Sequence, residues 1–163
     1  MYPIIQTLPA WAQVALLIVP SISAIFAAIG LALSASQVRR TNKQARATIV
    51  SDALKAFSTS VEMKRAFYMI EYSRFTYDES FHDSDLEREL DQLLQHFSIV
   101  ALSWQSGLLK APDLKPLEYF VLRIMRDSEV KMYVAFVESW SQQAELGQHP
   151  YSALAEMGRI LGA

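Results

Sequence analysis

The stretch LERELDQLLQHFSIVALSW, residues 86–104, carries the clearest structural pattern in the chain. Its apolar side chains recur every three or four positions, which is the spacing of one face of an α-helix. These residues are Leu86, Leu90, Leu93, Leu94, Phe97, Ala101 and Trp104. Ser84 stands before the pattern as an N-cap, with Glu87 placed for a capping box, and Gly107 follows as a helix stop. The stretch therefore predicts an amphipathic helix packed in a helical core.

Helical periodicity continues on both sides of this stretch. Before it, apolar residues from Val50 to Val61 step by four and three, which predicts one helix from residue 48 to about Tyr72. After it, KAPDLKP at residues 110–116 is a connection, followed by two further amphipathic helices and a short last helix from Pro150 to Leu161. No segment reads as a strand. We expect an all-α fold, with a bundle of about four to five helices over residues 48–163.

The front of the chain has a different composition. Residues 1–38 contain no charged side chain, and residues 10–33 read AWAQVALLIVPSISAIFAAIGLAL. About 20 mostly apolar residues suffice to cross a bilayer as a helix, so this run predicts a transmembrane helix, with Trp11 as its interface aromatic. A buried helix of a soluble core is one alternative, but such helices rarely have so long an apolar run. A cleaved signal peptide ending near Ser34 is another, but the cationic start is missing and the run is too long.

Four cations follow this run and none precedes it: Arg39, Arg40, Lys43 and Arg46. Lys and Arg accumulate on the cytoplasmic flank of membrane helices, and near anionic headgroups each contributes about 1 kcal/mol of attraction. The pattern predicts a single-pass protein of the inner membrane with its N-terminus outside and membrane lipid bound at these cations. The expected divisions are residues 1–38 with the membrane helix, a basic juxtamembrane segment at 39–47, and a cytoplasmic bundle at 48–163.

Small residues recur four apart within the predicted span, a spacing that lets membrane helices approach closely. They are Ser23, Ala24, Ala27, Ala28, Gly30 and Ser34. This ridge predicts packing against a second copy or another membrane protein.

The residues offer little for catalysis. The chain has no cysteine, and none of its three histidines stands three or four residues from another histidine or an acid on a predicted helix. His96 is expected at the edge of the core. No phosphate-binding loop or hydrolase motif is present, and the acidic run at 78–91 lacks the glycine of a calcium loop. We therefore expect no enzyme activity, no catalytic, cofactor or metal site and no identifiable small-molecule substrate; the net charge of −2 argues against nucleic acid.

Two clusters remain open to interpretation. The acidic run 78–91 is either a solvated face at a helix start or a docking surface for a partner. The aromatic cluster within residues 68–81 either covers one end of the bundle or, if exposed, forms a protein-interaction patch. Its members are Tyr68, Tyr72, Phe75, Tyr77 and Phe81.

Three segments together resemble a bacterial family of uncharacterised single-span membrane proteins. They are QVRRTNKQARA after the apolar run, SIVALSWQSGLLKAPDLKPL in the middle, and YVAFVESWSQQAELGQHPYSAL near the end. The chain departs from that family where Gln143 and Gln148 replace a basic residue. The resemblance implies the same architecture, a membrane helix followed by a helical domain, and assigns no activity.

These patterns favour a non-catalytic, membrane-anchored helical interaction module, either self-associating or an accessory subunit of a larger membrane assembly. The alternative is a membrane-active effector that forms a pore or perturbs the bilayer, for example in phage defence. Its hints are Pro20 and the polar residues Gln13, Ser21 and Ser23 within the apolar run. An enzyme acting at the membrane surface is the third possibility.

Overall fold

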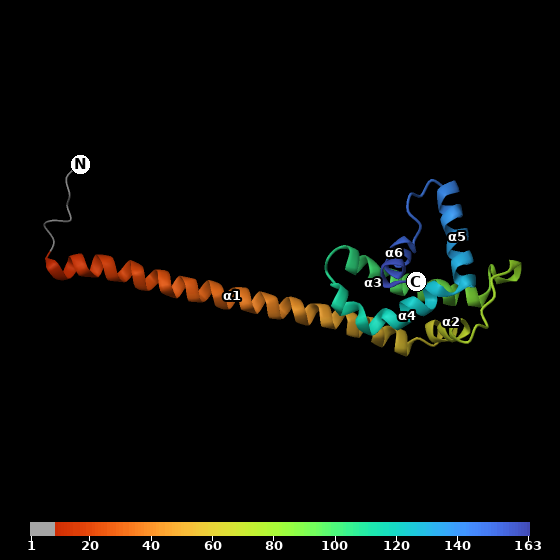
Figure 1. Cartoon of the computed structure of the whole chain (residues 1–163), viewed down its shortest axis with the longest axis horizontal. Helices are drawn as coiled ribbons and strands as arrows, with labels where there is room; N and C mark the ends of the chain where they lie inside the picture. Colours follow the sequence, from red (N-terminus) through yellow and green to blue (C-terminus); the bar gives the residue numbers. More distant parts are fainter. Residues whose placement is uncertain (1–8) are drawn as a thin grey trace. The chain divides into compact units, whose positions relative to one another are not determined.

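The computed structural model describes residues 9–163, except for the side chains of residues 10–29 and 32. Six α-helices lie within the described residues: α1 (Ala10–Thr59), α2 (Val61–Glu71), α3 (Asp85–Gln105), α4 (Lys115–Arg126), α5 (Ser128–Gln143) and α6 (Ser152–Leu161). Two short 3₁₀-helices, η2 (Glu79–Phe81) and η3 (Ala111–Leu114), complete the secondary structure. The six α-helices are labelled in Figure 1. No strand occurs across residues 9–163. The predicted all-helical fold is confirmed.

The chain divides into two units, Met1–Gln44 and Ala45–Ala163. In the first unit, the backbone of the predicted membrane span lies within α1. The side chains of Trp11, Ser23, Ala24, Ala27 and Ala28 are outside the described residues. Within the part of the chain that the structure describes, no helix has the length and apolarity needed to cross a membrane.

The second unit corrects the prediction of one helix running to about Tyr72. Helix α1 ends at Thr59 and α2 begins at Val61, with Ser60 between them in an extended conformation (φ −75°, ψ 126°). The Ser60 hydroxyl accepts a hydrogen bond from the Met63 N–H at 3.1 Å, the contact of an N-cap. Serine is among the preferred N-cap residues, so the chain can begin a new helix here without glycine or proline.

Packing of two phenylalanines gives the physical reason for this break. The rings of Phe57 and Phe67 meet edge to face, with centroids 5.6 Å apart. Ten residues along an unbroken helix would separate them by about 15 Å. The break at Ser60 therefore lets α1 and α2 contribute to the same core.

That core is centred on α3, which packs against α2 and α6, while α4 contacts α2, α5 and α6. The predicted stripe on α3 is confirmed, since Leu90, Leu93, Leu94, Phe97 and Ala101 are almost completely buried. Leu86 and Trp104 are partly buried at its two ends. The core also takes in Val50 and Ala53 of α1, so the end of that helix belongs to the bundle.

The helix ends in the bundle lie at or close to capping, glycine and proline residues. Ser84 is the N-cap of α3 as predicted, because its hydroxyl accepts from the Glu87 N–H at 3.1 Å. The Glu87 carboxylate, however, accepts from the Asp83 N–H instead of closing the expected capping box on Ser84. Helix α3 ends just before Gly107, whose φ of +78° favours glycine. The last helix begins at Ser152, two residues after Pro150.

Candidate functional site

The four cations expected at the membrane surface differ in their surroundings. Arg39, Arg40 and Lys43 are exposed on α1. Arg46 is half-buried and forms an ion pair with Asp113 of η3, with 3.2 Å between Nη1 and Oδ2. Arg46 thus helps to hold η3 against α1 in the bundle unit, in addition to any headgroup contact. Lipid binding by the four cations stays a prediction.

Two members of the predicted packing ridge are described. Gly30 and Ser34 are both exposed on α1, and a carbon added at Gly30 would meet no atom within 4 Å. Both positions are open to an approaching helix, and the role of the ridge stays a prediction.

The aromatic cluster of residues 68–81 is divided by the fold. Phe75 and Phe81 are buried, with rings 5.3 Å apart, and Tyr77 is half-buried beside them. Tyr68 and Tyr72 instead project from α2 and remain 51% and 64% exposed. One part of the cluster therefore covers the bundle end, and the other part is a surface feature.

The buried part of the cluster lies beside a polar network formed by Tyr77, His82 and Glu87. The Nδ1 atom of His82 lies 3.0 Å from Glu87 Oε1, and its Nε2 atom lies 3.2 Å from the Tyr77 hydroxyl. A carboxylate can only accept, so the His82 Nδ1–H donates to Glu87, and the other ring nitrogen meets the Tyr77 hydroxyl. Burial, together with the charge of Glu87, raises the pKa of Tyr77. The three side chains fix the loop before α3 onto the first turn of that helix.

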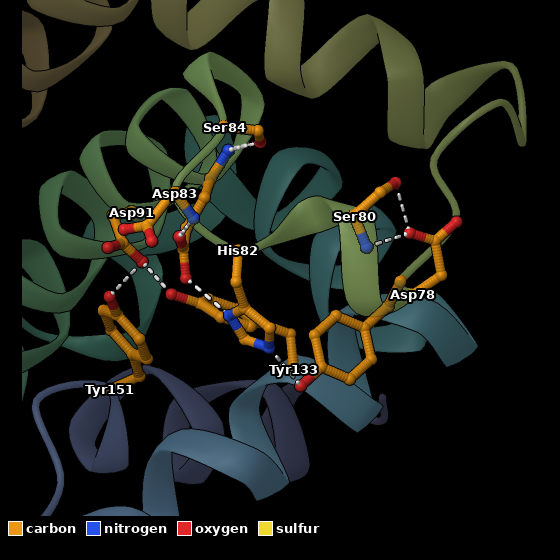
Figure 2. A network of polar contacts seen from close by, with 10 residues as sticks. Asp78, Ser80, His82, Asp83, Ser84, Asp91, Tyr133 and Tyr151 are labelled. Carbon is orange, nitrogen blue, oxygen red and sulfur yellow. Dashed lines mark hydrogen bonds and ion pairs between the residues drawn. The ribbon is translucent and has the colours of Figure 1, made fainter.

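A second set of polar contacts lies one turn along α3 at Asp91, which Figure 2 shows together with His82. Asp91 Oδ1 accepts hydrogen bonds from the hydroxyls of Tyr133 on α5 and Tyr151 before α6, both at 2.6 Å. Burial of the two phenols, followed by their contact with Asp91, raises the pKa of both tyrosines. Asp91 thus joins three segments that are distant in sequence.

Three further acids of the run 78–91 also have specific contacts. Asp78 caps η2 by accepting a hydrogen bond from the Ser80 N–H. Asp85 forms an ion pair with Arg88, and Glu89 forms one with Arg65 of α2 at 3.2 Å. Within the described residues, no group of three or more metal-ligating side chains is placed to hold an ion. The network is suited to joining helices, because its carboxylates accept hydrogen bonds from tyrosine, histidine and backbone donors.

Sequence reasoning did not find this network. His82 and Glu87 are five residues apart across a loop, and Asp91 meets tyrosines 42 and 60 residues away. Only the dense acids at the start of a predicted helix marked the region, and they gave no information about their partners.

The exposed part of the aromatic cluster belongs to a surface groove on α2, which we call the α2 groove. It has a volume of about 510 Å³ and is lined by Val61, Lys64, Arg65, Tyr68, Met69, Tyr72 and Arg74. The Tyr68 and Tyr72 rings are stacked at 6.0 Å, and the Arg74 guanidinium lies 5.6 Å from the centre of the Tyr72 ring. The groove combines an aromatic wall with three cationic side chains. The cations were missed by sequence reasoning, although Lys64 and Arg65 lie one turn before Tyr68.

No protein-family model matches the chain, and no curated protein or solved structure matches it significantly. The resemblance to single-span bacterial proteins stays a sequence-based prediction. The class that the fold defines is an all-helical bundle carrying an aromatic, cationic groove.

Proposed function

We propose that the chain is a non-catalytic, membrane-anchored helical interaction module that serves a membrane protein assembly. The observation that carries this proposal is the α2 groove. Its tyrosines are exposed side by side, whereas the other aromatic residues of the same sequence cluster pack into the bundle. Tyrosine is enriched at protein interfaces because its ring supplies apolar contact area and its hydroxyl a hydrogen bond.

The membrane part of the proposal is supported by the charge pattern. Twenty-four uncharged residues at 10–33 are followed by the exposed cations Arg39, Arg40 and Lys43. In this proposal the N-terminus lies outside the inner membrane and the bundle lies in the cytoplasm, so the groove faces cytoplasmic partners or cytoplasmic parts of membrane proteins.

Site-specific photocrosslinking in cells tests the interaction. A photoreactive amino acid at Tyr72 should yield a discrete crosslinked protein in the membrane fraction. The matched control is Gln92, an exposed position on α3, which should yield none. Equal crosslinking from both positions, or none from Tyr72, would contradict a docking role for the groove.

Reporter fusions test the anchor separately. An enzyme that is active only in the cytoplasm, fused after Ala163, should be active, and the fusion should resist extraction from membranes by alkaline carbonate. Activity of a periplasm-only reporter at the same site would reverse the orientation and restore the signal-peptide interpretation.

A further inference from the structure

We infer that the α2 groove binds an acidic peptide segment that carries a large apolar side chain. This inference rests on the proposed function and names the chemical class of its partner. It follows from the shape of the groove, the charge of its lining and the way its side chains are held.

The apolar component comes from one face of α2. Val61, Tyr68 and Tyr72 are 68%, 51% and 64% exposed and follow one another at helical spacing. The opposite face of the same helix is buried through Met63, Ala66, Phe67 and Ile70. Because that packing fixes α2 in the bundle, the tyrosines form a surface that exists before a partner arrives. Preformed surfaces lose less conformational entropy on binding.

The charge of the groove is of one sign. Lys64, Arg65 and Arg74 line it, and no acidic residue is among its lining residues. The neighbouring Glu71 is occupied elsewhere, since its carboxylate accepts from Tyr119 at 2.6 Å and from Arg123 at 3.1 Å. A chain with a net charge of −2 therefore presents a local cationic concavity here. An acidic partner is complementary to it.

Two of the cations are positioned by specific contacts. Arg65, whose side chain is 62% exposed, pairs with Glu89 at the junction of α2 and α3, and this pair balances part of its charge. Arg74 is held against the Tyr72 ring, which leaves its N–H groups available for a carboxylate. A carboxylate at this point would lie beside an apolar side chain resting on the stacked tyrosines.

A peptide fits the groove better than a lipid surface does. An anionic bilayer supplies negative charge but no aromatic or leucine side chain to rest on the stacked tyrosines of this open groove. An acidic segment with an aromatic or leucine residue supplies both the charge and the shape.

Peptide selection on the intact protein tests the inference. The full chain, held in neutral detergent micelles, is used to select from a random peptide library displayed on phage. The enriched peptides should combine Asp or Glu with Trp, Phe or Leu. Their fluorescein-labelled forms should bind about tenfold or more weakly to Arg74→Glu and to Tyr72→Ala, and more weakly as salt increases. Lys131→Glu, an equal charge change on α5, should leave binding unaltered.

Other outcomes of these experiments would contradict the inference. Enrichment of neutral or basic peptides, no enrichment at all, or unchanged affinity for Arg74→Glu would overturn the inference. So would binding of anionic phospholipid vesicles that is lost in Arg74→Glu without any peptide enrichment. Thermal melts check that the variants remain folded. If photocrosslinking from Tyr72 captures a protein while the library yields no acidic peptides, the interaction module stands and the acidic class fails. If the library yields acidic peptides and crosslinking from Tyr72 yields nothing, the groove binds acidic peptides but the proposed interaction module fails.

Discussion

Arg123 of α4 caps the C-terminus of α2 by donating from Nη2 to the Glu71 carbonyl oxygen at 2.7 Å. The same nitrogen reaches the Ile70 carbonyl at 2.8 Å, and Nε pairs with the Glu71 carboxylate at 3.1 Å. The last carbonyls of a helix lack partners within the helix, and a cation also compensates the negative end of its dipole. One side chain from α4 thus completes the helix that carries the α2 groove.

Removing this guanidinium should destabilise the bundle. Arg123→Ala leaves partly buried carbonyls and the Glu71 carboxylate without their donor, at a cost of about 1.5–3 kcal/mol. Thermal melts of the full chain, followed by near-ultraviolet circular dichroism, measure the loss. Arg88→Ala is the matched control, because its pair with Asp85 is exposed on both sides and should contribute little. Equal melting temperatures for the two variants would show that Arg123 does not support α2.

The core position of α3 is tested by two leucines on the same helix. Leu94 is completely buried and Leu102 is 54% exposed. Leu94→Ala should cost about 2–5 kcal/mol, because it removes buried volume from a core that cannot fully collapse, whereas Leu102→Ala should change stability little. Urea denaturation of the full chain gives both values. A larger loss from Leu102→Ala would mean that the packed face of α3 has been assigned wrongly.

Gly158 marks a close approach between α6 and α4. A Cβ atom at this position would lie 2.8 Å from Met125 Cγ and 2.9 Å from Met125 Cβ. Gly158→Ala should therefore be destabilising by about 1–3 kcal/mol through overpacking, although alanine alone favours a helix by ~1 kcal/mol over glycine. Gly30→Ala adds the same methyl group inside α1 where no atom lies within 4 Å, so only the helix preference of alanine acts and the melting temperature should not fall. A Gly158→Ala variant that melts later than wild type would refute this packing.

The hydrogen bonds of Tyr133 and Tyr151 to Asp91 predict that the folded chain loses stability in alkali. Their pKa values are raised in the folded chain, first by burial and then by the contact with Asp91, so folding favours the protonated phenols. The stability they supply is complete below pH about 10, the value of a free tyrosine, and is lost as the pH rises above it. The double variant Tyr133→Phe/Tyr151→Phe should lose less stability than wild type between pH about 9 and 11. Tyr68→Phe, which changes an exposed phenol, should keep the wild-type dependence.

Sequence periodicity could predict those parts of the fold that depend on neighbouring residues. The stripe from Leu86 to Trp104 and the cap at Ser84 are read from residues within a few turns of one another, and both are present. The break at Ser60 could not be read in the same way, because it follows from the meeting of Phe57 and Phe67 in the core. Serine inside a helix is a weak signal until the packing on both sides is known.

The candidate site was less accessible to sequence reasoning than the fold. Tyr68 and Tyr72 were visible as part of an aromatic cluster, but their exposure depends on which face of α2 packs against α3. The Asp91 contacts join residues 42 and 60 positions apart, and Arg123 reaches Glu71 over 52 positions. Such pairs have no local pattern, since only tertiary packing brings them together.

The final turns of α1 have a mechanical consequence. Val50, Ala53 and Phe57 are buried in the core, and the Phe57 ring lies 4.9 Å from Phe120 and 5.9 Å from Phe97. Within the second unit, the segment of α1 that starts at Ala45 is thus joined to the core through interlocked side chains. Force applied at Ala45 would therefore be borne by the phenylalanine packing itself, and sustained pulling there would draw Val50, Ala53 and Phe57 out of the core.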